Sequence, residues 1–476
     1  MIGRQKEISE LEELYNGNRA ELVAIYGRRR IGKTYLVEQT FKDRFSFRHA
    51  GLSPAEFGRK GLLEEQIKHF FNSLKSFGLE DTKCPETWLD AFFLLQNLLE
   101  KKDDGKRQVL FIDELPWLDT ARSGFMTAFE GFWNNWGCHR ENLMVIVCGS
   151  ANSWMLDKLI NNHGGLYGRV TYEIKLFPFT LSECEEFMKS KNIRISRYDI
   201  AQGFMIFGGI PYYLQYFKRG LSLAQNVDNL FFNNGAKLVF EYDRLFSSVF
   251  QNPSLVKAVV EFLYTKNAGY TRREITDKLG ITDGGAVTSC LNALISSDFV
   301  MRYVPFGMSK KQEHYKLIDP FCIFYLHFVN GFGKMNHDFW EQNVKSPSVV
   351  SWRGFAFENL CFNHIKQIKA ALGISGVSSK QSAWSKRDDD NDGTQIDLLI
   401  DRNDNVINMC EIKFYGDDFT VGKDYYRIIL HRQELLSNEI PKRTAIHSTL
   451  ITTFGLTYNE YSGVFSNVIT LDELFA

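Results

Sequence analysis

The sequence has no excess of charge of either sign: 57 acidic and 56 basic residues leave a formal net charge of −1. A chain with so small a net charge has no global positive field, so any contact with nucleic acid must be local. No apolar run reaches the roughly 18 residues that a membrane span needs, and the first residues lack the apolar core of a signal peptide. We therefore expect a cytoplasmic protein that makes no membrane contact.

Clustered cysteines are also missing. The eight cysteines stand singly, with no Cys-x-x-Cys pair and no cysteine–histidine cluster of zinc-binding spacing, which indicates reduced, packed thiols. The sequence contains no internal repeat either. What it has is the composition of a globular protein, 44% hydrophobic and 24% charged, and its 476 residues predict two to four domains.

The pattern of apolar residues changes several times along the chain. Over residues 1–180, short apolar runs alternate with helical patterns, which predicts an α/β domain with a parallel sheet. A helical lid is expected at 181–250, a winged helix-turn-helix at 251–319 and a connecting helical segment at 320–348. The last block, 349–476, combines a helical pattern with two strands and predicts a second α/β domain.

A phosphate-binding loop is predicted at Gly27, four residues, then Gly32, Lys33 and Thr34, between a strand pattern at 21–26 and a helical pattern. Successive backbone N–H groups at a helix N-terminus can wrap an anion, and glycines allow the backbone to come close. The bound nucleotide is expected to be ATP. Lys33 is expected to reach its β and γ phosphates, and the Thr34 hydroxyl to coordinate Mg²⁺.

Three consecutive arginines, Arg28 to Arg30, lie inside this loop. Arg30 is counted among the candidate nucleotide-binding residues, because a guanidinium in this place can touch phosphate or reach a neighbouring subunit. The alternative is that the three arginines form a solvated, basic loop surface.

A second nucleotide motif is predicted where the apolar strand 107–112 ends in two acids, Asp113 and Glu114. Asp113 is expected to hold the Mg²⁺ shell. Glu114 would orient or polarise the attacking water, and this position distinguishes hydrolytic sites from sites that only bind nucleotide. The alternative is that both acids cap the next turn.

Two further candidates follow in the sequence. The apolar strand 143–148 is followed by Ser150 and Asn152, either of which can sense the γ phosphate from a neighbouring strand end. Arg169 is a candidate for stabilising the charge of the transition state, since a guanidinium bridges phosphate oxygens. An ordinary surface ion pair is the alternative for Arg169. Whether it acts within its own subunit or on a neighbour in an oligomer is open.

Six segments resemble, in sequence and in order, the archaeal-type ATPase family in the STAND-related branch of AAA+ NTPases: IGRQKEISEL, YGRRRIGKT, FIDELPWL, CGSANSWM, LYGRV and GGIPYYL. The resemblance spans about residues 2–215. It implies base or ribose contacts by Ile2, Gly3 and Arg4, and nucleotide sensing through Pro211. It also implies a winged helix, followed by a C-terminal domain similar to the restriction-endonuclease-like PD-(D/E)xK nuclease fold.

The strands of this last domain carry a candidate metal site. Asp397 lies in one apolar strand, and Glu411 and Lys413 alternate along one face of the next. Two such carboxylates can bind one or two Mg²⁺ ions that activate water for attack on a phosphodiester, with Lys413 supporting the charge. Glu358 on the preceding helix can complete the metal shell. The alternatives are inherited fold residues and an exposed strand face with salt bridges.

The predicted reading helix of the winged helix, 283–297, carries no Lys or Arg, which weakens the case for binding in the major groove. Basic residues occur instead at Arg272 and Arg273 and at Lys310 and Lys311, enough for phosphate contacts. A protein-binding or hinge role is equally open. We expect an ATP-regulated, Mg²⁺-dependent DNA-processing protein; the alternative is a nucleotide-controlled switch or scaffold that binds DNA or protein without cutting.

Overall fold

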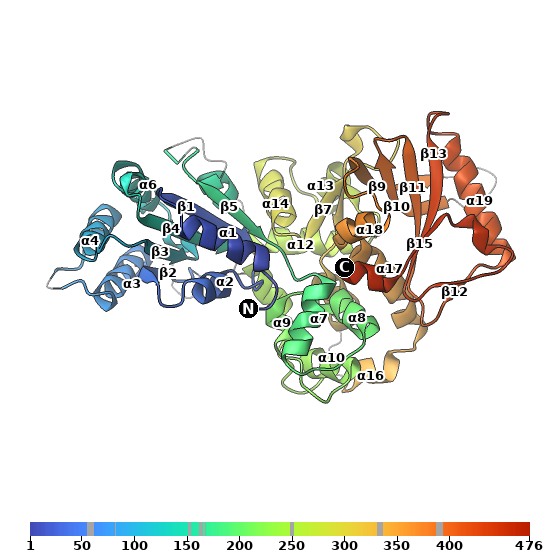
Figure 1. The fold of residues 1–476 in the computed structure, drawn as a ribbon, viewed down its shortest axis with the longest axis horizontal. Helices are drawn as coiled ribbons and strands as arrows, with labels where there is room; N and C mark the ends of the chain where they lie inside the picture. Colours follow the sequence, from blue (N-terminus) through green and yellow to red (C-terminus); the bar gives the residue numbers. More distant parts are fainter. Residues whose placement is uncertain are drawn as a thin grey trace. The chain divides into compact units, whose positions relative to one another are not determined.

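The structure, a computed structural model, describes residues 1–54, 61–80, 82–150, 154–160, 165–166, 168–247, 252–330, 337–386 and 394–476. The chain divides into two compact units (Figure 1). Unit 1 comprises Met1–Pro178, Asp243–Val256 and Thr288–Asp298, and unit 2 comprises Phe179–Tyr242, Lys257–Val287 and Phe299–Ala476. Among the helices of the described residues, none is both long enough and apolar enough to cross a membrane.

A five-stranded parallel sheet forms the centre of unit 1, with the strand order β2-β3-β4-β1-β5 (Figure 1). The strands are β1 (Glu21–Gly27), β2 (Phe45–Ala50), β3 (Gln108–Asp113), β4 (Leu143–Ser150) and β5 (Tyr172–Leu176). Strands β3 and β4 are buried along their whole length, as apolar strands in the middle of a covered parallel sheet are. The predicted α/β domain with a parallel sheet is therefore confirmed.

Helices cover this sheet. They are α1 (Gln5–Tyr15), α2 (Lys33–Thr40), α3 (Leu62–Ser76), α4 (Trp88–Lys101), α5 (Leu115–Leu118) and α6 (Phe125–Asn135). The apolar sides of α3, α4 and α6 share one core with Leu22, Leu110 and Val145 of the strands. Helix α4 begins where the Thr87 hydroxyl accepts a hydrogen bond from the Asp90 backbone N–H, a common N-cap.

Three more helices lie at or across the boundaries between the units in sequence: α11 (Glu241–Ser247), α12 (Pro253–Tyr264) and α14 (Gly285–Ser296). The first segment of unit 2 is helical and contains α7 (Leu181–Ser190), α8 (Arg197–Phe207), α9 (Pro211–Leu214) and α10 (Leu223–Phe231). Capping boxes start two of them, at Thr180 and at Ser222. The helices expected here are present, while their action as a lid stays a prediction.

A small antiparallel sheet follows, with the order β6-β8-β7 and the strands β6 (Tyr270–Thr271), β7 (Val300–Tyr303) and β8 (His314–Leu317). Helix α13 (Arg272–Leu279) starts at a Thr271 capping box and ends at Gly280, whose φ of 62° suits glycine. Helices and hairpin occur in the order that the sequence pattern predicted. The identification of this segment as a winged helix stays a prediction.

The C-terminal part of unit 2 contains a five-stranded mixed sheet, ordered β15-β13-β11-β10-β9. Its strands are β9 (Ser379–Lys386), β10 (Thr394–Arg402), β11 (Val406–Lys413), β13 (Ala445–Thr452) and β15 (Asn467–Ile469). Strands β9, β10 and β11 pair antiparallel, whereas β11, β13 and β15 pair parallel. The structure therefore has an α/β arrangement here, as the sequence pattern predicted.

Helices and one short ladder complete this part of unit 2: α15 (Pro320–Phe324), α16 (Phe339–Asn343), α17 (Pro347–Asn363), α18 (Ile365–Ala371), β12 (Phe419–Thr420), α19 (Lys423–Ser437) and β14 (Leu456–Thr457). Ile429 and Leu436 of α19 pack into the same core as Met409 of β11 and Leu450 of β13. Helix α19 therefore lies on one face of the mixed sheet (Figure 1).

A buried histidine, His364, makes the stability of unit 2 sensitive to acid. Its Nδ1 lies 2.9 Å from the Leu360 carbonyl oxygen, and its Nε2 lies 3.2 Å from the Leu181 backbone nitrogen, which donates to it. Only the neutral ring, with its proton on Nδ1, satisfies both contacts. Burial lowers the pKa of His364 to about 4, although the bond to Leu360 opposes this shift.

We expect the stabilising effect of neutral His364 to be fully present above about pH 6.5 and to be lost as the pH falls toward 4, because the unfolded chain then binds a proton that the folded chain excludes. The full loss is about 3 kcal/mol. Thermal midpoints measured between pH 7 and pH 4 test this. His364→Gln should flatten the acid dependence, whereas exposed His337→Gln should follow the wild type; equal slopes for both variants would contradict the assignment.

Candidate functional site

The predicted phosphate-binding loop lies at the carboxyl end of β1, which pairs with β4 and β5 in the unit 1 sheet. Gly27 stands opposite Ser150, the last residue of β4, in the strand register. A Cβ at Gly27 would lie 2.3 Å from the Leu176 carbonyl oxygen, so only glycine fits there. Gly32 has a φ of 90°, a left-handed conformation that lets the loop turn into α2. The loop therefore has the strand–loop–helix geometry of an anion site.

Lys33, the first residue of α2, is buried and bends back over the loop. Its amine donates to the carbonyl oxygens of Gly27 at 3.2 Å and Arg28 at 3.0 Å. Burial lowers the pKa of Lys33, while Glu114 and Asp113 nearby act in the opposite direction. The amine is thus held where the loop would receive phosphate oxygens.

Thr34 and Asp113 come into direct contact, although 79 positions separate them in sequence. The Thr34 hydroxyl donates to Asp113 Oδ2 at 2.6 Å. Asp113 is the last residue of β3 and is buried. A hydroxyl and a carboxylate side by side at the start of a helix are the oxygen donors that Mg²⁺ prefers. These two residues therefore fit the predicted Mg²⁺ position.

Glu114 follows directly and occupies a left-handed backbone conformation, with a φ of 46°. Its backbone N–H donates to Asp113 Oδ1 at 2.9 Å, which fixes the turn after β3. Burial raises the pKa of the Glu114 carboxyl, and Lys33 counteracts part of this shift. A non-glycine residue in this conformation at a strand end is strained, and such strain is common at functional sites.

The N-terminal segment reaches the same loop through Arg4. The buried Arg4 guanidinium donates to the carbonyl oxygens of Phe177 at 2.7 Å and Ile31 at 3.4 Å. Gly3 and Arg4 both have positive φ, 59° and 67°, which turns the chain into α1. Ile2 is half-buried beside them. The structure thus connects Arg4 to the phosphate-binding loop, while the base or ribose contacts of Ile2, Gly3 and Arg4 stay predictions.

The arginines of the loop differ in their surroundings. Arg28 is 2% exposed, so the interpretation as a solvated surface is wrong for this residue. It lies near Asp298, whose carboxyl pKa is raised by burial and lowered again by Lys175 and Arg28. Arg30 is half-buried, with a φ of 71°. Its role toward phosphate stays a prediction.

The remaining candidate residues for the nucleotide site have fewer described contacts with the phosphate-binding loop. Ser150 is buried at the end of β4, next to the loop in register, whereas Asn152 lies outside the described residues. Arg169 is exposed, and its described contact is a backbone bond to Leu166. Pro211 starts α9 in unit 2. The structure therefore brings Ser150 to the site, and leaves the roles of Arg169 and Pro211 as predictions.

In unit 2, Glu411 is the centre of a polar cluster on β11. Its two oxygens pair with the Lys413 amine at 2.8 Å and the Arg432 guanidinium at 2.5 Å. The Tyr425 hydroxyl of α19 also donates to it. Burial acts against the charged form, but Lys413 and Arg432 outweigh it and lower the pKa of Glu411. The expected neighbourhood of Glu411 and Lys413 on one face of the strand is present.

Asp397 and Glu358 line a cavity of about 120 Å³ beside this cluster. Asp397 accepts a hydrogen bond from the Gln395 amide at 2.8 Å, and Glu358 accepts one from the Asn267 amide at 2.7 Å. Burial, and then the nearby Asp397, raise the pKa of Glu358 to about 7. The pKa of Asp397 is raised by burial and by Glu411. Two half-buried carboxyls thus share the cavity.

The three predicted metal ligands Glu358, Asp397 and Glu411 do not form a single compact set. Among the described residues, the one group of three acidic, histidine or cysteine side chains whose ligand atoms all lie within 4.8 Å is Asp228, Asp338 and Glu341. The Glu411 carboxylate is instead paired with the side chains of Lys413 and Arg432. A pair of carboxylates, Asp397 with Glu358 or with Glu411, is the arrangement left for an ion.

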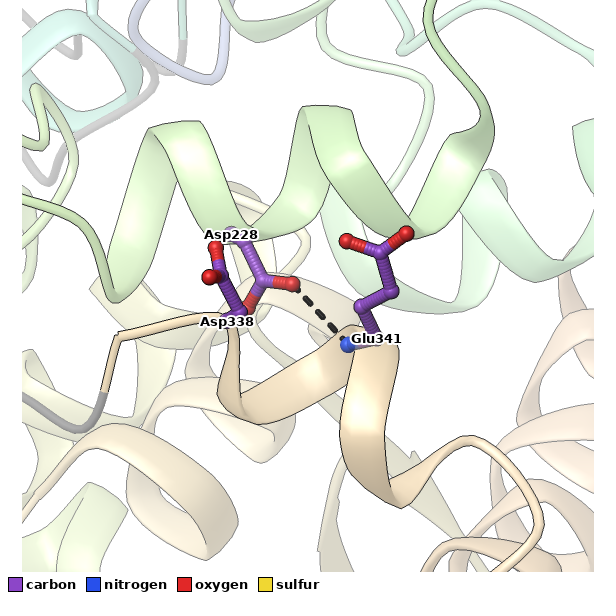
Figure 2. Close-up of side chains that lie close together, drawn as sticks. All are labelled: Asp228, Asp338 and Glu341. Atoms are coloured by element: carbon purple, nitrogen blue, oxygen red, sulfur yellow. Dashed lines mark hydrogen bonds between the residues drawn. The ribbon is translucent and has the colours of Figure 1, made fainter.

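The Asp228 group has a structural explanation. Figure 2 shows the Asp228 carboxylate next to the start of α16, with a dashed bond to Glu341. Its oxygens accept the backbone N–H groups of Trp340 at 2.7 Å and Glu341 at 2.9 Å. A carboxylate that accepts the first N–H groups of a helix is a cap, so the group needs no metal.

The basic residues predicted for phosphate contact are only partly available. Arg272 pairs with Asp283 at 2.5 Å, and Arg273 pairs with Asp277 at 3.5 Å. Lys310 and Lys311 of the hairpin are exposed. Two of the four cations, Arg272 and Arg273, are therefore partly neutralised by acidic residues close to them in sequence.

Sequence reasoning missed Lys316, Asn267, Tyr425 and Arg432, which touch or line the C-terminal site. Lys316 is buried on β8. Burial lowers its pKa, and the nearby Glu358 and Asp397 counteract part of this shift. A lysine inside an otherwise apolar strand run was the available signal for it. The other three lie in helices or turns, where polar residues are common and give no signal.

The chain matches one protein family over its first 217 residues and one relative over most of its length. Residues 1–217 match the family described as an ATPase domain predominantly from Archaea. The uncharacterized protein MJECL04 of Methanocaldococcus jannaschii is 24% identical over 441 residues, which cover 91% of this chain and 92% of that protein. The uncharacterized ATP-binding protein MJ0423 of the same organism is 40% identical over 43 residues, 9% of this chain and 73% of that protein.

Two solved structures are similar at lower identity. The Walker-type ATPase PABY2304 of Pyrococcus abyssi is 20% identical, with a TM-score of 0.46, over 68% of this chain and 96% of that one. The ORC2 protein of Aeropyrum pernix, in ADPNP–ADP complexes, is 13% identical, with a TM-score of 0.39, over 69% of this chain and 94% of that one. The phosphate-binding loop and the contact of Thr34 with Asp113 agree with this family match, so residues 1–217 form an ATPase domain of the P-loop NTPase type that is similar to the family found predominantly in Archaea.

Proposed function

We propose that this protein hydrolyses ATP at the end of the unit 1 sheet, and that nucleotide state controls a Mg²⁺-dependent site in unit 2 that cleaves DNA phosphodiesters. The first half of this proposal is carried by one observation, the 2.6 Å contact of Thr34 with Asp113 beside a buried lysine. Mg²⁺, when bound, would neutralise phosphate charge there.

The residues of unit 1 divide the work of ATP hydrolysis. Backbone N–H groups from Gly27 to Gly32 receive phosphate oxygens, and Lys33 exchanges its loop carbonyls for the β and γ phosphates. Thr34 and Asp113 would hold Mg²⁺. Glu114, on its strained turn, orients water and takes up its proton.

Other candidates act around this centre. Ser150 senses the γ phosphate, Arg169 stabilises charge as it separates, and Arg30 adds a phosphate contact. The segment Ile2–Arg4 encloses the adenosine end, which is supported by the Arg4 bond to the Ile31 carbonyl oxygen. Pro211 would transmit nucleotide state to the helices of unit 2.

The DNA-cleaving half rests on the carboxyls of unit 2. In the antiparallel pairing of β10 with β11, Leu398 is opposite Cys410. Asp397 and Glu411 are the next residues on the two strands, so this register brings them close to each other. Half-buried carboxylates in a cavity are a suitable oxygen donor set for Mg²⁺. Lys413 lies 2.8 Å from Glu411 and can support the charge of the phosphodiester.

A switch or scaffold that binds DNA or protein without cutting is the second candidate function. One observation favours it: both oxygens of Glu411 already pair with Lys413 and Arg432, and Tyr425 donates as well. A carboxylate with this many partners is not free to ligate a metal unless those bonds rearrange.

Cleavage of single-stranded, duplex and branched DNA, with Mg²⁺ or Mn²⁺ and with or without ATP, tests the proposal. We expect wild type to cut at least one substrate, and Asp397→Ala and Glu411→Ala to reduce cutting below detection, because each removes a metal-ligand carboxylate. Asp401→Ala, at the far end of β10, is the matched control and should cut normally.

The dependence on ATP reports the coupling between the units. If wild type cuts nothing while its ATPase activity is intact, the switch is the better description and the unit 2 carboxylates are structural. If Glu411→Ala loses folded structure by circular dichroism, Glu411→Gln replaces it, since the amide keeps the shape of the side chain.

A further inference from the structure

Lys316 is a buried cation at a cavity wall. It lies on β8, is 6% exposed, and lines the same cavity of about 120 Å³ as Glu358 and Asp397. Among the described residues its amine makes no hydrogen bond and no ion pair within 4.0 Å. The centroid of the Phe362 ring lies 4.9 Å from the amine. A lysine placed in this way leaves its three N–H donors to whatever enters the cavity.

Such a lysine is costly unless it has a use. Removing an ammonium from water without a paired partner is unfavourable, and most buried lysines are paired. Lys413 on β11 is paired with the Glu411 carboxylate at 2.8 Å, and Lys266, which also lines the cavity, is exposed. Lys316 is thus the buried cation of this cavity, and among the described residues its amine has no hydrogen-bond acceptor.

The cavity is formed by two modules of unit 2. The first, here called the hairpin module, comprises residues 266–287 and 299–317 and supplies Lys316 and Asn267. The second is the C-terminal domain, residues 349–476, which supplies Glu358 and Asp397. Asn267 donates to Glu358 at 2.7 Å. The hairpin is also tied to β9, because the Phe306 backbone N–H donates to the Ala383 carbonyl oxygen at 3.0 Å. The two modules therefore share one site.

The size and charge of the cavity define the class of ligand. About 120 Å³ is well below the roughly 300–1,000 Å³ of pockets that hold drug-sized molecules, so a single phosphate group fits and a stacked base pair does not. An ammonium opposite two carboxylates can hold an anion that also contacts a metal ion.

We propose that Lys316 binds the phosphate group of a nucleic-acid strand in the unit 2 site, and that Asn267 orients Glu358 beside it, so that the module with the hairpin completes the site of the C-terminal domain. This inference rests on the proposed DNA-cleaving function for the identity of the ligand. It assigns the hairpin module a contact with substrate that does not depend on its exposed lysines.

The test compares full-length Lys316→Met and Lys316→Arg with Lys310→Met, an exposed lysine of the same hairpin, as the matched control. A short single-stranded oligonucleotide, with Ca²⁺ in place of Mg²⁺ to prevent cutting, is the binding probe. Inorganic phosphate is the competitor. We expect Lys316→Met to weaken oligonucleotide binding about tenfold or more, and to make it insensitive to phosphate. Lys316→Arg should keep most of the binding.

A purely structural lysine that only neutralises the carboxylates would give a different result. Lys316→Met would then lower the thermal midpoint and leave the dissociation constant of the oligonucleotide unchanged, which overturns the proposal. If Lys316→Met does not fold, the wild type answers the question, since inorganic phosphate should protect Lys316 from reductive methylation. Absence of protection contradicts phosphate binding.

The cleavage assay separates this inference from the proposed function. Normal cutting by Lys316→Met, with Asp397→Ala inactive, overturns the role of Lys316 and leaves the nuclease in place. If the wild type binds the oligonucleotide but never cuts DNA, and Lys316→Met loses this binding, the phosphate site is supported and the nuclease is rejected.

Discussion

Glu114→Gln is expected to leave ATP binding close to that of the wild type and to slow hydrolysis by about 100-fold or more, the range expected when a general base is lost. The amide keeps the size of the side chain but cannot take a proton from water. The Glu114 backbone N–H donates to Asp113 Oδ1, a bond that the substitution keeps, so the binding residues should stay in place.

Phosphate release and the affinity for a fluorescent ATP analogue measure the two halves of this prediction. Glu141→Gln, an exposed acid just before β4 and at the other end of the sheet, should match wild type in both. Because burial raises the pKa of Glu114, the wild-type rate should fall on the acid side at a pH above the ordinary range of a glutamate. Hydrolysis at the wild-type rate by Glu114→Gln would show that another group orients the water.

The nucleotide site was predictable because its parts are contiguous in sequence and its assembly follows from topology. Residues that end neighbouring parallel strands meet at one edge of the sheet, so Asp113 and Ser150 had to lie near Gly27. The contact of Thr34 with Asp113 is the result. The burial of Arg28 was not predictable from its neighbours in sequence, and Asp298, the acid on which Arg28 acts electrostatically, is 270 positions away in the chain.

The unit 2 site was predictable only along its strands. The alternation that places Glu411 and Lys413 on one face is local, and the structure has it. The partners Tyr425 and Arg432 come from a helix whose rotation is set by packing of Ile429 and Leu436 into the core. No spacing rule in the sequence fixes that rotation. Lys316 depends, in the same way, on how two modules pack together.

Lys33→Ala is expected to weaken ATP binding by about 10- to 100-fold, the effect of losing charge-assisted hydrogen bonds to phosphate. The Lys33 amine is already desolvated and held by the Gly27 and Arg28 carbonyl oxygens, so little reorganisation opposes its transfer to phosphate. Titration with the same ATP analogue measures the loss. Lys42→Ala, an exposed lysine just beyond α2, is the matched control and should bind normally.

Thermal unfolding distinguishes this loss of contact from a damaged fold. Burial lowers the pKa of Lys33, which means that its charged form is disfavoured in the folded protein without nucleotide. Removing that charge relieves the cost, so Lys33→Ala should unfold no earlier than the wild type when nucleotide is absent. The rise in midpoint that ATP gives the wild type should then be missing, because stabilisation by a ligand depends on its affinity for the folded state. A lower midpoint without nucleotide would mean that the Lys33 bonds to the loop carbonyls hold the loop together, and that weakened ATP binding follows from a disordered loop.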